Sequence, residues 1–248
     1  MARLNGKIAV ITGASQGMGT AHARAFVAEG AKVVLTDLNA TAGEALAEEL
    51  GAAAIFVEHD VADAAGWARV VAAAEARFGP INVLVNNAGI IGPVAKTEEL
   101  SQADFLKVCA VNQLGVFLGM QAVLPAMVAQ GGGSIVNISS ISGIVAIVGT
   151  PNLAYAGSKF AVRGMTKQVA VEYGSQGIRA NSVHPGYVKT PMMVAATDED
   201  GGGASAAIPI GRFAESDEIS PLVVFLASDE ASFITGMEHV IDGGMTAC

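Results

Sequence analysis

Short runs of β-branched and other apolar residues alternate along the chain with longer, alanine-rich amphipathic stretches. Seven such runs occur: KIAVIT (7–12), AKVVLTD (31–37), AAIFVEHD (53–60), INVLVNN (81–87), GSIVNISS (133–140), IRANSVHP (178–185) and EHVIDGG (238–244). Helix-length segments separate them, which is the order of a βαβ protein. Because the runs are apolar on both faces, we expect a doubly wound, Rossmann-type parallel sheet of about seven strands with helices on both faces. Such a sheet places ligand sites just after its strands.

One stretch lacks a clean period. Residues 191–213, PMMVAATDEDGGGASAAIPIGRF, contain three consecutive glycines and an acidic run, which predicts a mobile loop. It does not separate two units of the chain. We therefore interpret residues 1–248 as one domain with a flexible substrate lid around 191–213, rather than as two domains joined by a linker.

Composition limits the partners. Of the 248 residues, 52% are hydrophobic and only 5% aromatic, which suits an aliphatic core in one large α/β domain. A formal net charge of −9 argues against nucleic acid or an anionic membrane as the main partner, because either would repel the surface. We expect a small-molecule ligand instead.

Cysteine usage and the N-terminus bear on location. Cys109 and Cys248 are the only cysteines, which suggests neither a disulfide framework nor a cysteine metal site. MARLNGKIAVITG has too short an apolar run for a signal peptide, and we expect no segment with the roughly 18 apolar residues of a membrane span. We predict a cytoplasmic protein without a metal. Its high apolar content favours an oligomer over a monomer.

A glycine-rich segment, ITGASQGMG, follows the first strand and opens the first helix. Gly13, Gly17 and Gly19 let the backbone approach a pyrophosphate, which then lies on the free N–H groups and positive end of the helix. The strand before and the helix after are the context that such a motif requires. We predict a phosphate-binding turn here, with Ser15 and Met18 as further cofactor contacts.

Acidic residues end the second and third strands. Asp37 lies 18 residues after Gly19, where a carboxylate accepts hydrogen bonds from ribose hydroxyls and repels a 2′-phosphate. Neither the glycine segment nor residues 38–40 contain an arginine or lysine, so NAD is favoured over NADP. Asp60 is a weaker candidate. It either holds the adenine amino group or caps the helix that begins near Ala64.

Tyr155 and Lys159 lie four residues apart in NLAYAGSKFAV (152–162). Residues with this spacing project from one face of a helix. In a chain that is only 15% charged, the pair indicates either chemistry or coincidence.

Four motifs in order settle the choice. TGASQGMG, NNAG (86–89), Tyr155-x-x-x-Lys159 and HPG (184–186) make the chain resemble the short-chain dehydrogenase/reductase family over essentially all of its length. The resemblance implies a Rossmann-type single domain, nicotinamide-dependent oxidoreduction of an alcohol or carbonyl, and commonly a homotetramer.

The resemblance also implies roles for individual residues. Tyr155 becomes the acid/base, Lys159 its activator and ribose anchor, and Asn112 in AVNQLG the holder of a relay water. A free tyrosine titrates near 10, so base catalysis near neutrality requires a pKa lower by roughly 2 to 3 units, or about 3–4 kcal/mol. A nearby ammonium and the positive nicotinamide both favour the phenolate.

The catalytic serine that the family implies has more than one candidate. NISSISG offers Ser139, Ser140 and Ser142. Counting from the strand end selects Ser140, whereas counting back from Tyr155 selects Ser142. An insertion is accommodated more easily in a loop than in a strand, so we choose Ser140 and keep Ser142 as the alternative.

The same pattern implies further cofactor contacts after the third, fourth and sixth strands: Val61, Asn87, Gly89, Val188 and Thr190. Within NNAG, Asn86 is expected nearest the adenosine ribose and Gly89 near the nicotinamide. The Val188 backbone and the Thr190 hydroxyl are expected to hold the carboxamide. His184, before a proline at a strand end, is interpreted as a packing or hydrogen-bonding residue and not as a catalyst.

The expected substrate pocket is poor in charge. Residues 91–97, the GIVAIVGTPNL loop and the lid suit a hydrophobic secondary alcohol or ketone. The segments VHPG…TPM and ITGMEHVIDGG look most like those of bacterial hydroxysteroid dehydrogenases, so a steroid or another cyclic ketone is the favoured substrate class.

Two alternatives remain. A 3-oxoacyl-carrier-protein reductase needs a basic docking patch, for which Arg163, Lys167 and Arg179 are thin support. A non-catalytic nicotinamide-sensing protein is less expected, because the tyrosine, lysine, asparagine and a serine are all present.

Overall fold

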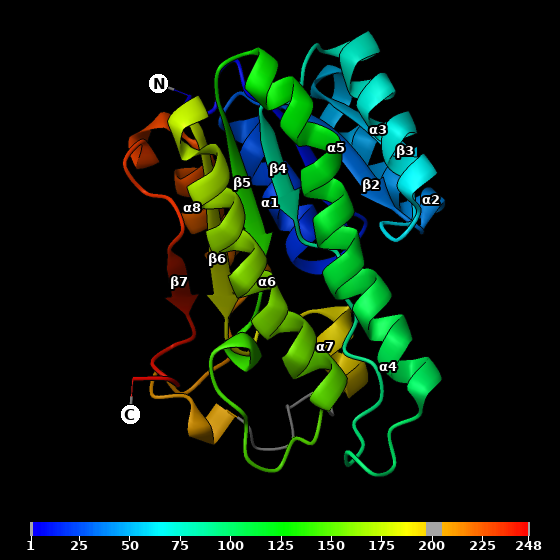
Figure 1. The fold of residues 1–248 in the computed structure, drawn as a ribbon, viewed down its shortest axis with the longest axis vertical. Helices are drawn as coiled ribbons and strands as arrows, with labels where there is room; N and C mark the ends of the chain where they lie inside the picture. Colours follow the sequence, from blue (N-terminus) through cyan, green and yellow to red (C-terminus); the bar gives the residue numbers. More distant parts are fainter. Residues whose placement is uncertain (1, 197–204, 248) are drawn as a thin grey trace.

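The computed structural model describes residues 2–196 and 205–247, which build a single parallel sheet in the order β3-β2-β1-β4-β5-β6-β7 (Figure 1). The strands are β1 Ile8–Thr12, β2 Lys32–Asp37, β3 Ala54–Glu58, β4 Val83–Asn86, β5 Gly133–Ile138, β6 Ile178–Pro185 and β7 Glu238–Ile241. Every neighbouring pair of strands is parallel. Each strand lies within one of the seven predicted runs, so the Rossmann-type sheet is confirmed.

Helices cover both faces of the sheet. The main ones are α1 Gly17–Ala28, α2 Ala40–Leu50, α3 Ala64–Arg77, α4 Gln102–Cys109, α5 Gly115–Ala129, α6 Leu153–Tyr173, α7 Pro191–Ala196 and α8 Ser216–Ala227. In Figure 1, α5 and α6 lie in front of the sheet and α1 and α8 behind it. A π-helical turn, Ala110–Leu114, joins α4 to α5.

Each face has its own hydrophobic core. Phe26, Leu35 and Ile219 belong to a cluster between the sheet and α1, α2 and α8. Val34 and Trp67 belong to a second cluster between the sheet and α3, α5 and α6. Leu35 and Val34 are neighbours on β2 and are both fully buried, on opposite faces. This two-sided burial explains why the central strands carry runs of consecutive apolar residues, such as Val33, Val34 and Leu35 on β2.

The run from Gln102 to Ala129 corrects one expectation. It forms a 28-residue helical stretch that is long and apolar enough to cross a membrane by length and composition. Half of its most apolar window is buried inside the protein, where Val123 and Met127 join the second core. The stretch therefore packs as a core helix against the sheet.

The segment 191–213 is more ordered than a plain loop at both of its ends. It begins with α7, and at its far end Ile208 and Phe213 are buried. The Phe213 ring stacks on Tyr187 with 5.3 Å between centroids. The flexible substrate lid remains a prediction, because residues 197–204 lie outside the described residues.

Gly43 shows how closely α2 approaches the sheet. A Cβ atom at this position would lie 2.0 Å from Cε2 of Phe56, a ring carbon on β3. Real side chains do not tolerate such a contact, so only glycine fits here while Phe56 keeps its position.

We expect Gly43→Ala to lower the free energy of unfolding by about 1–3 kcal/mol, because the added methyl overpacks the α2–β3 contact. Chemical denaturation measures the loss. The double variant Gly43→Ala/Phe56→Leu is the control and should recover part of it, since the smaller side chain leaves room. A single variant as stable as the wild type would contradict this close contact.

Candidate active site

The strand order reverses between β1 and β4, and a cleft of about 250 Å³ opens at their carboxyl ends. Crevices of this kind bind ligands in doubly wound sheets. Nine predicted cofactor residues line it: Gly13, Gly17, Met18, Asp37, Asp60, Val61, Asn87, Gly89 and Thr190. The sequence did not point to Gln16, Leu38, His59 and Val111, which also line the cleft.

Three predicted cofactor residues support the cleft from beside it. Ser15 donates its backbone N–H to Asp37, and Gly19 packs α1 against the glycine turn. Val188 is buried and forms an isolated β-bridge with Ala214.

The glycine turn suits an anion. A Cβ atom on Gly19 would lie 2.0 Å from the carbonyl oxygen of Gly13, so α1 reaches the turn only because residue 19 is glycine. The helix begins at Gly17 behind Gln16, whose side chain makes no cap hydrogen bond. Uncapped N–H groups and the positive end of α1 therefore face the cleft, which fits the pyrophosphate of a dinucleotide.

Asp37 ties the second strand to this turn. Its Oδ2 accepts a hydrogen bond from the Ser15 N–H at 3.0 Å, and its Oδ1 accepts one from the Asn39 N–H at 3.0 Å. The Ser15 hydroxyl donates to the carbonyl of Asn39 at 3.1 Å. The side chain of Asp37 is thus fixed at the wall of the cleft.

The two asparagines of NNAG have different surroundings. Asn86 is 2% exposed and donates from Nδ2 to Oδ1 of Asn137 at 2.9 Å, so its expected place beside the ribose is wrong. Asn87 lines the cleft and donates from Nδ2 to the carbonyls of Thr12 and Gly13. Successive strand residues point to opposite faces, and the two side chains differ for that reason.

Thr12 is a positioning residue that the sequence analysis missed. Its Oγ1 accepts hydrogen bonds from the N–H groups of Asn87 and Ala88, both at 3.0 Å. These contacts tie the end of β4 to the end of β1. A threonine directly before the first glycine of the turn was the available signal.

At the end of β3, the structure contradicts one of the two roles expected for Asp60. Asp60 accepts a hydrogen bond from the Ala62 N–H at 2.9 Å, whereas Asp63 caps α3 by accepting from the Ala65 N–H. The capping role considered for Asp60 is therefore wrong, and its side chain lines the cleft. His59 is 2% exposed and lies edge-on to Trp67 with 4.7 Å between ring centroids.

Tyr155 and Lys159 lie together at the start of α6. The Asn152 side chain caps this helix by accepting from the Tyr155 N–H at 3.2 Å. Lys159 Nζ lies 5.6 Å from the centroid of the Tyr155 ring, so the two residues share one face as their spacing predicts. Lys159 is 4% exposed, and its Nζ donates to the Ile138 carbonyl at 2.8 Å.

Burial dominates the electrostatics of this pair. It raises the pKa of Tyr155, while a side-chain hydrogen bond with Ser140 lowers that pKa. It also lowers the pKa of Lys159 to about 8. We expected the Lys159 ammonium to lower the phenol pKa, but in the protein alone burial outweighs every lowering contribution. The Tyr155 phenol is therefore protonated at neutral pH in the free chain.

The serine turn follows β5 directly. Ser140 caps a 3₁₀ turn, Ile141–Gly143, with its Oγ accepting from the Ser142 N–H at 3.1 Å. Of the three candidate serines, Ser140 is the one that lowers the pKa of Tyr155. Ser139 instead donates from its hydroxyl to the Lys159 carbonyl at 2.9 Å and is buried.

Asn112 lies in the π-helical turn between α4 and α5. Its Oδ1 accepts from the Ile90 N–H at 2.9 Å, and its Nδ2 donates to the Ile90 carbonyl at 2.9 Å and the Ser158 hydroxyl at 3.0 Å. A Cβ atom on Gly89 would contact both Asn112 Oδ1 and Lys159 Nζ, so the three residues meet. The sequence indicated a helix here but not its π turn, a feature frequent at functional sites.

His184 is buried and fully hydrogen-bonded. Its Nδ1 lies 2.9 Å from the Ser140 carbonyl oxygen and its Nε2 lies 2.8 Å from Oγ of Ser182. Because a carbonyl only accepts, Nδ1 is the protonated nitrogen. The structure confirms a hydrogen-bonding histidine.

Comparisons with known proteins agree with this geometry. A family model described as enoyl-(acyl carrier protein) reductase matches residues 13–246. The chain is 47% identical, over 99% of its length and 91% of the relative, to 3-alpha-(or 20-beta)-hydroxysteroid dehydrogenase of Mycobacterium tuberculosis (strain ATCC 25618 / H37Rv). It is 46% identical to trans-4-hydroxycyclohexanecarboxylate dehydrogenase of Sinomonas cyclohexanicum, over 99% of the chain and 95% of that protein.

A solved structure is similar throughout. The crystal structure of a gluconate 5-dehydrogenase from Burkholderia cenocepacia J2315, in complex with NADP and tartrate, matches with a TM-score of 0.93 and 35% identity. The match covers 100% of this chain and 98% of that one. With its glycine turn, its Tyr155–Lys159 pair and these relatives, the chain belongs to the short-chain dehydrogenase/reductase family of oxidoreductases.

Proposed function

We propose that this protein is an NAD-dependent oxidoreductase that interconverts a hydrophobic secondary alcohol, preferably a ring-bearing one, and its ketone. One observation carries the proposal: the Tyr155 ring lies 5.6 Å from Nζ of the buried Lys159. Lys159 in turn meets Gly89, which lines the dinucleotide cleft. An acid/base group is thereby placed where a bound nicotinamide ring can be reached.

In the oxidative direction, Tyr155 takes the proton of the substrate hydroxyl, and reduction reverses this step. Ser140 donates a hydrogen bond to the substrate oxygen and steadies the charge that develops there. The bound coenzyme supplies the hydride acceptor and a positive charge. Lys159 anchors the ribose and passes the proton onward, with Asn112 holding the water that completes the path.

NAD is the proposed coenzyme because of the charge at the ribose end of the cleft. Asp37 presents a carboxylate that two backbone N–H groups hold in place, and such a group disfavours a 2′-phosphate. Residues 38–40 supply no cation to offset it. Because the solved relative is bound to NADP, the preference of this chain for NAD has to be measured directly.

Apolar loops near the site support a hydrophobic substrate. Val145 and Val148, in the loop that leads into α6, are 39% and 99% exposed, and Leu153, the first residue of α6, is 47% exposed. Apolar surface of this kind favours ligands with large apolar area. Two relatives are named for hydroxysteroid and hydroxycyclohexanecarboxylate substrates, which also contain rings.

The carrier-protein reductase alternative loses its support in the structure. Arg163 and Lys167 both form ion pairs with Glu238, at 2.8 and 3.0 Å. Arg179 donates to the Ser228 carbonyl and lies near Asp229. These three cations are therefore offset and do not form a basic docking patch.

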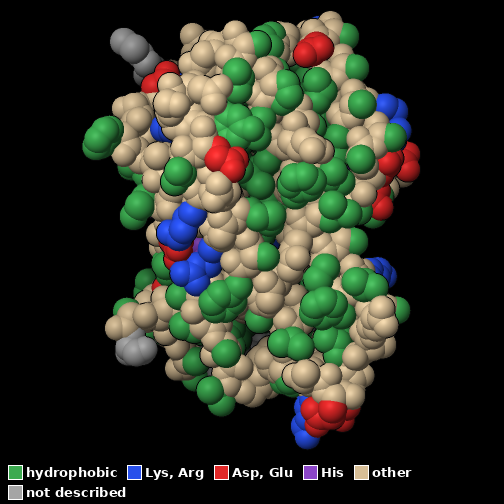
Figure 2. All heavy atoms as spheres, viewed as in Figure 1, with side chains coloured by type: hydrophobic (Ala, Val, Ile, Leu, Met, Phe, Trp, Pro, Cys, Tyr) green, Lys and Arg blue, Asp and Glu red, His purple; other side chains and the backbone are tan. Residues whose placement is uncertain are grey.

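A homotetramer in the cytoplasm completes the proposal. Figure 2 shows hydrophobic side chains gathered over α4, α5 and α6 on the face in view. The exposed large residues of these helices and of the turn between α4 and α5 are Phe105, Leu106, Leu114, Phe117, Val128, Leu153, Phe160 and Val171. Burial between subunits would remove this surface from water.

The proposed activity is tested with cyclohexanol, trans-4-hydroxycyclohexanecarboxylate and a 3α-hydroxysteroid, each offered with NAD. We expect NADH formation with at least one of them. Tyr155→Phe should lower kcat by roughly 10³-fold or more, because no group remains to take the proton, while NAD still binds. NADH absorbance measures turnover, and calorimetry measures NAD binding.

Two outcomes would contradict the proposal. NAD binding without turnover of any alcohol or ketone would favour a sensing protein, and turnover of carrier-linked 3-oxoacyl substrates alone would favour the reductase. Undiminished activity in Tyr155→Phe would remove the mechanism.

We expect Asp37→Ala to weaken NAD binding roughly 10-fold or more while NADP binding is unchanged or improved. The substitution removes the ribose acceptor and also the charge that repels a 2′-phosphate. Dissociation constants for both coenzymes give the comparison, with Glu58→Ala on the neighbouring strand as the control. Equal weakening of NAD and NADP would refute the coenzyme assignment.

A further inference from the structure

The turn that carries Ser140 is held at two carbonyl groups. His184 Nδ1 bonds to the Ser140 carbonyl at 2.9 Å, and Arg163 Nη1 donates to the Gly143 carbonyl at 2.7 Å. Inside the turn, the Gly143 N–H donates to the Ser140 carbonyl at 2.9 Å. Because Gly143 and Ser140 are hydrogen-bonded within one turn, a displacement of Gly143 also displaces the backbone of Ser140.

Arg163 is fixed from a distant part of the chain. It lies one turn after Lys159 on α6, and its Nη2 forms an ion pair with Oε2 of Glu238 on β7 at 2.8 Å. The two side chains are only 26% and 21% exposed, so solvent screens this pair less than a surface pair. Its two terminal nitrogens thus connect β7 to the serine turn, which a planar guanidinium can do with fixed geometry.

We propose that Arg163, held by Glu238, is a positioning residue that fixes the turn of Ser140 and so keeps the Ser140 hydroxyl in place beside Tyr155. This inference rests on the proposed function, because it gives Arg163 a purpose only where Ser140 and Tyr155 act together. Among the described residues, the hydrogen bond and the ion pair of Arg163 go to Gly143 and Glu238 and not to Tyr155 or the cleft, so the arginine acts through the turn.

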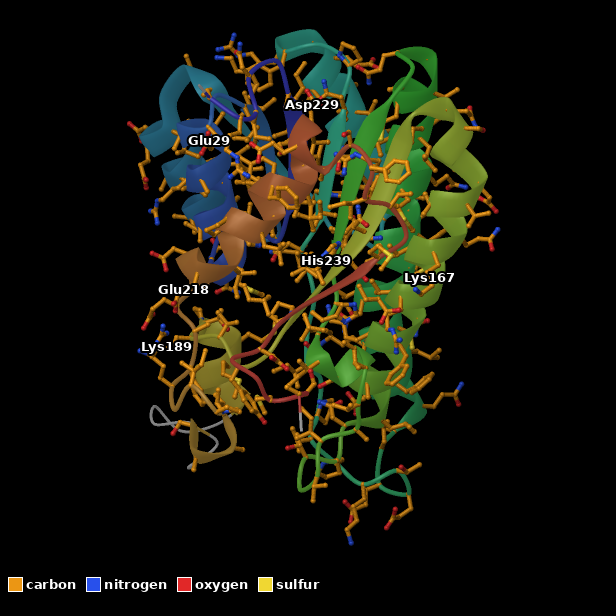
Figure 3. The ribbon with its side chains drawn as sticks, turned by 90° about the vertical axis from the view of Figure 1, so that its left-hand side faces the viewer. Glu29, Lys167, Lys189, Glu218, Asp229 and His239 are labelled. Atoms are coloured by element: carbon orange, nitrogen blue, oxygen red, sulfur yellow. The ribbon has the colours of Figure 1, made fainter. Side chains whose placement is uncertain are left out.

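Lys167 offers a matched control. It lies one turn further along α6, beside β7 (Figure 3), and its Nζ pairs with Oε1 of the same Glu238 at 3.0 Å. Its other hydrogen bond goes to the Gly236 carbonyl and not to the serine turn. Arg163→Met and Lys167→Met therefore each remove one cation from Glu238, but only the first releases Gly143.

The direct readout is the pH at which the Tyr155 phenol ionises, followed by phenolate absorbance in the unliganded protein. The chain has three tyrosines, so a titration of Tyr155→Phe subtracts the other two. Ser140→Ala should raise this midpoint, because the hydrogen bond that lowers the Tyr155 pKa is lost. Arg163→Met should raise it in the same direction, and Lys167→Met should leave it unchanged.

Turnover of the best alcohol from the substrate panel gives the second readout. We expect Arg163→Met to lower kcat roughly 10- to 100-fold with little change in the KM for NAD, as misplacement of a catalytic group does. Arg163→Lys keeps the charge but cannot span both partners, so its midpoint and kcat should lie between those of the wild type and Arg163→Met. Should Arg163→Met not fold, Glu238→Gln should shift both readouts part of the way.

Several results would overturn the inference. If Arg163→Met and Lys167→Met gave the same Tyr155 midpoint and the same kcat, Arg163 would be no more than a structural ion-pair partner of Glu238. If Arg163→Lys had the midpoint and kcat of the wild type, the effect of Arg163 would come from its charge alone. A Ser140→Ala shift without an Arg163→Met shift would refute the positioning role while leaving the proposed function intact. A Ser140→Ala variant with an unchanged Tyr155 midpoint and unchanged turnover would refute both the positioning role of Arg163 and the proposed mechanism, since Ser140 would then not act on Tyr155.

Discussion

Burial of Lys159 and partial burial of Tyr155 are the constraint on which the rest of the site depends. Removing a phenol and an ammonium from water disfavours the charged form of each, so the pKa of Tyr155 rises and that of Lys159 falls to about 8. At neutral pH in the free chain the phenol is therefore uncharged, whereas Lys159, with a pKa of about 8, keeps most of its charge. The positive nicotinamide of a bound coenzyme favours the phenolate form of Tyr155, so acid/base chemistry is coupled to coenzyme binding.

The fold supports this arrangement through contacts at the carboxyl ends of the strands. Thr12 ties β1 to β4, and Lys159 Nζ holds the last carbonyl of β5. Ser140 follows two residues after Ile138, whose carbonyl accepts from Lys159. The carbonyl of Ser140 itself is hydrogen-bonded to His184 on β6. Because each partner comes from a different strand or helix, the geometry is fixed by the sheet and not by any single loop.

The sequence predicted the sheet and the shared helical face of Tyr155 and Lys159, because both rest on local patterns. Two-sided apolar runs give buried parallel strands, and the spacing of Tyr155 and Lys159 gives a shared helical face. The choice of Ser140 over Ser142 stays a prediction, which the lowering of the Tyr155 pKa by Ser140 supports.

Features that depend on tertiary contacts could not be predicted in this way. The inward turn of Asn86 is set by its pairing with Asn137 across two strands, and the π turn at Asn112 by its bonds to Ile90. The balance of pKa contributions at Tyr155 depends on burial, which no motif encodes. The link from Glu238 through Arg163 joins residues 75 positions apart and is visible only in the folded chain.

The central claim is that Tyr155 is neutral in the free chain and loses its proton when the coenzyme binds. Calorimetric titration of NAD at about pH 8, in two buffers with different ionisation enthalpies, measures the protons released on binding. We predict a net release from the wild-type protein that is clearly larger than the release from Tyr155→Phe, in which Lys159 can still lose a proton. No release, or an equal release from Tyr155→Phe, would contradict the account, because the proton would then not come from Tyr155.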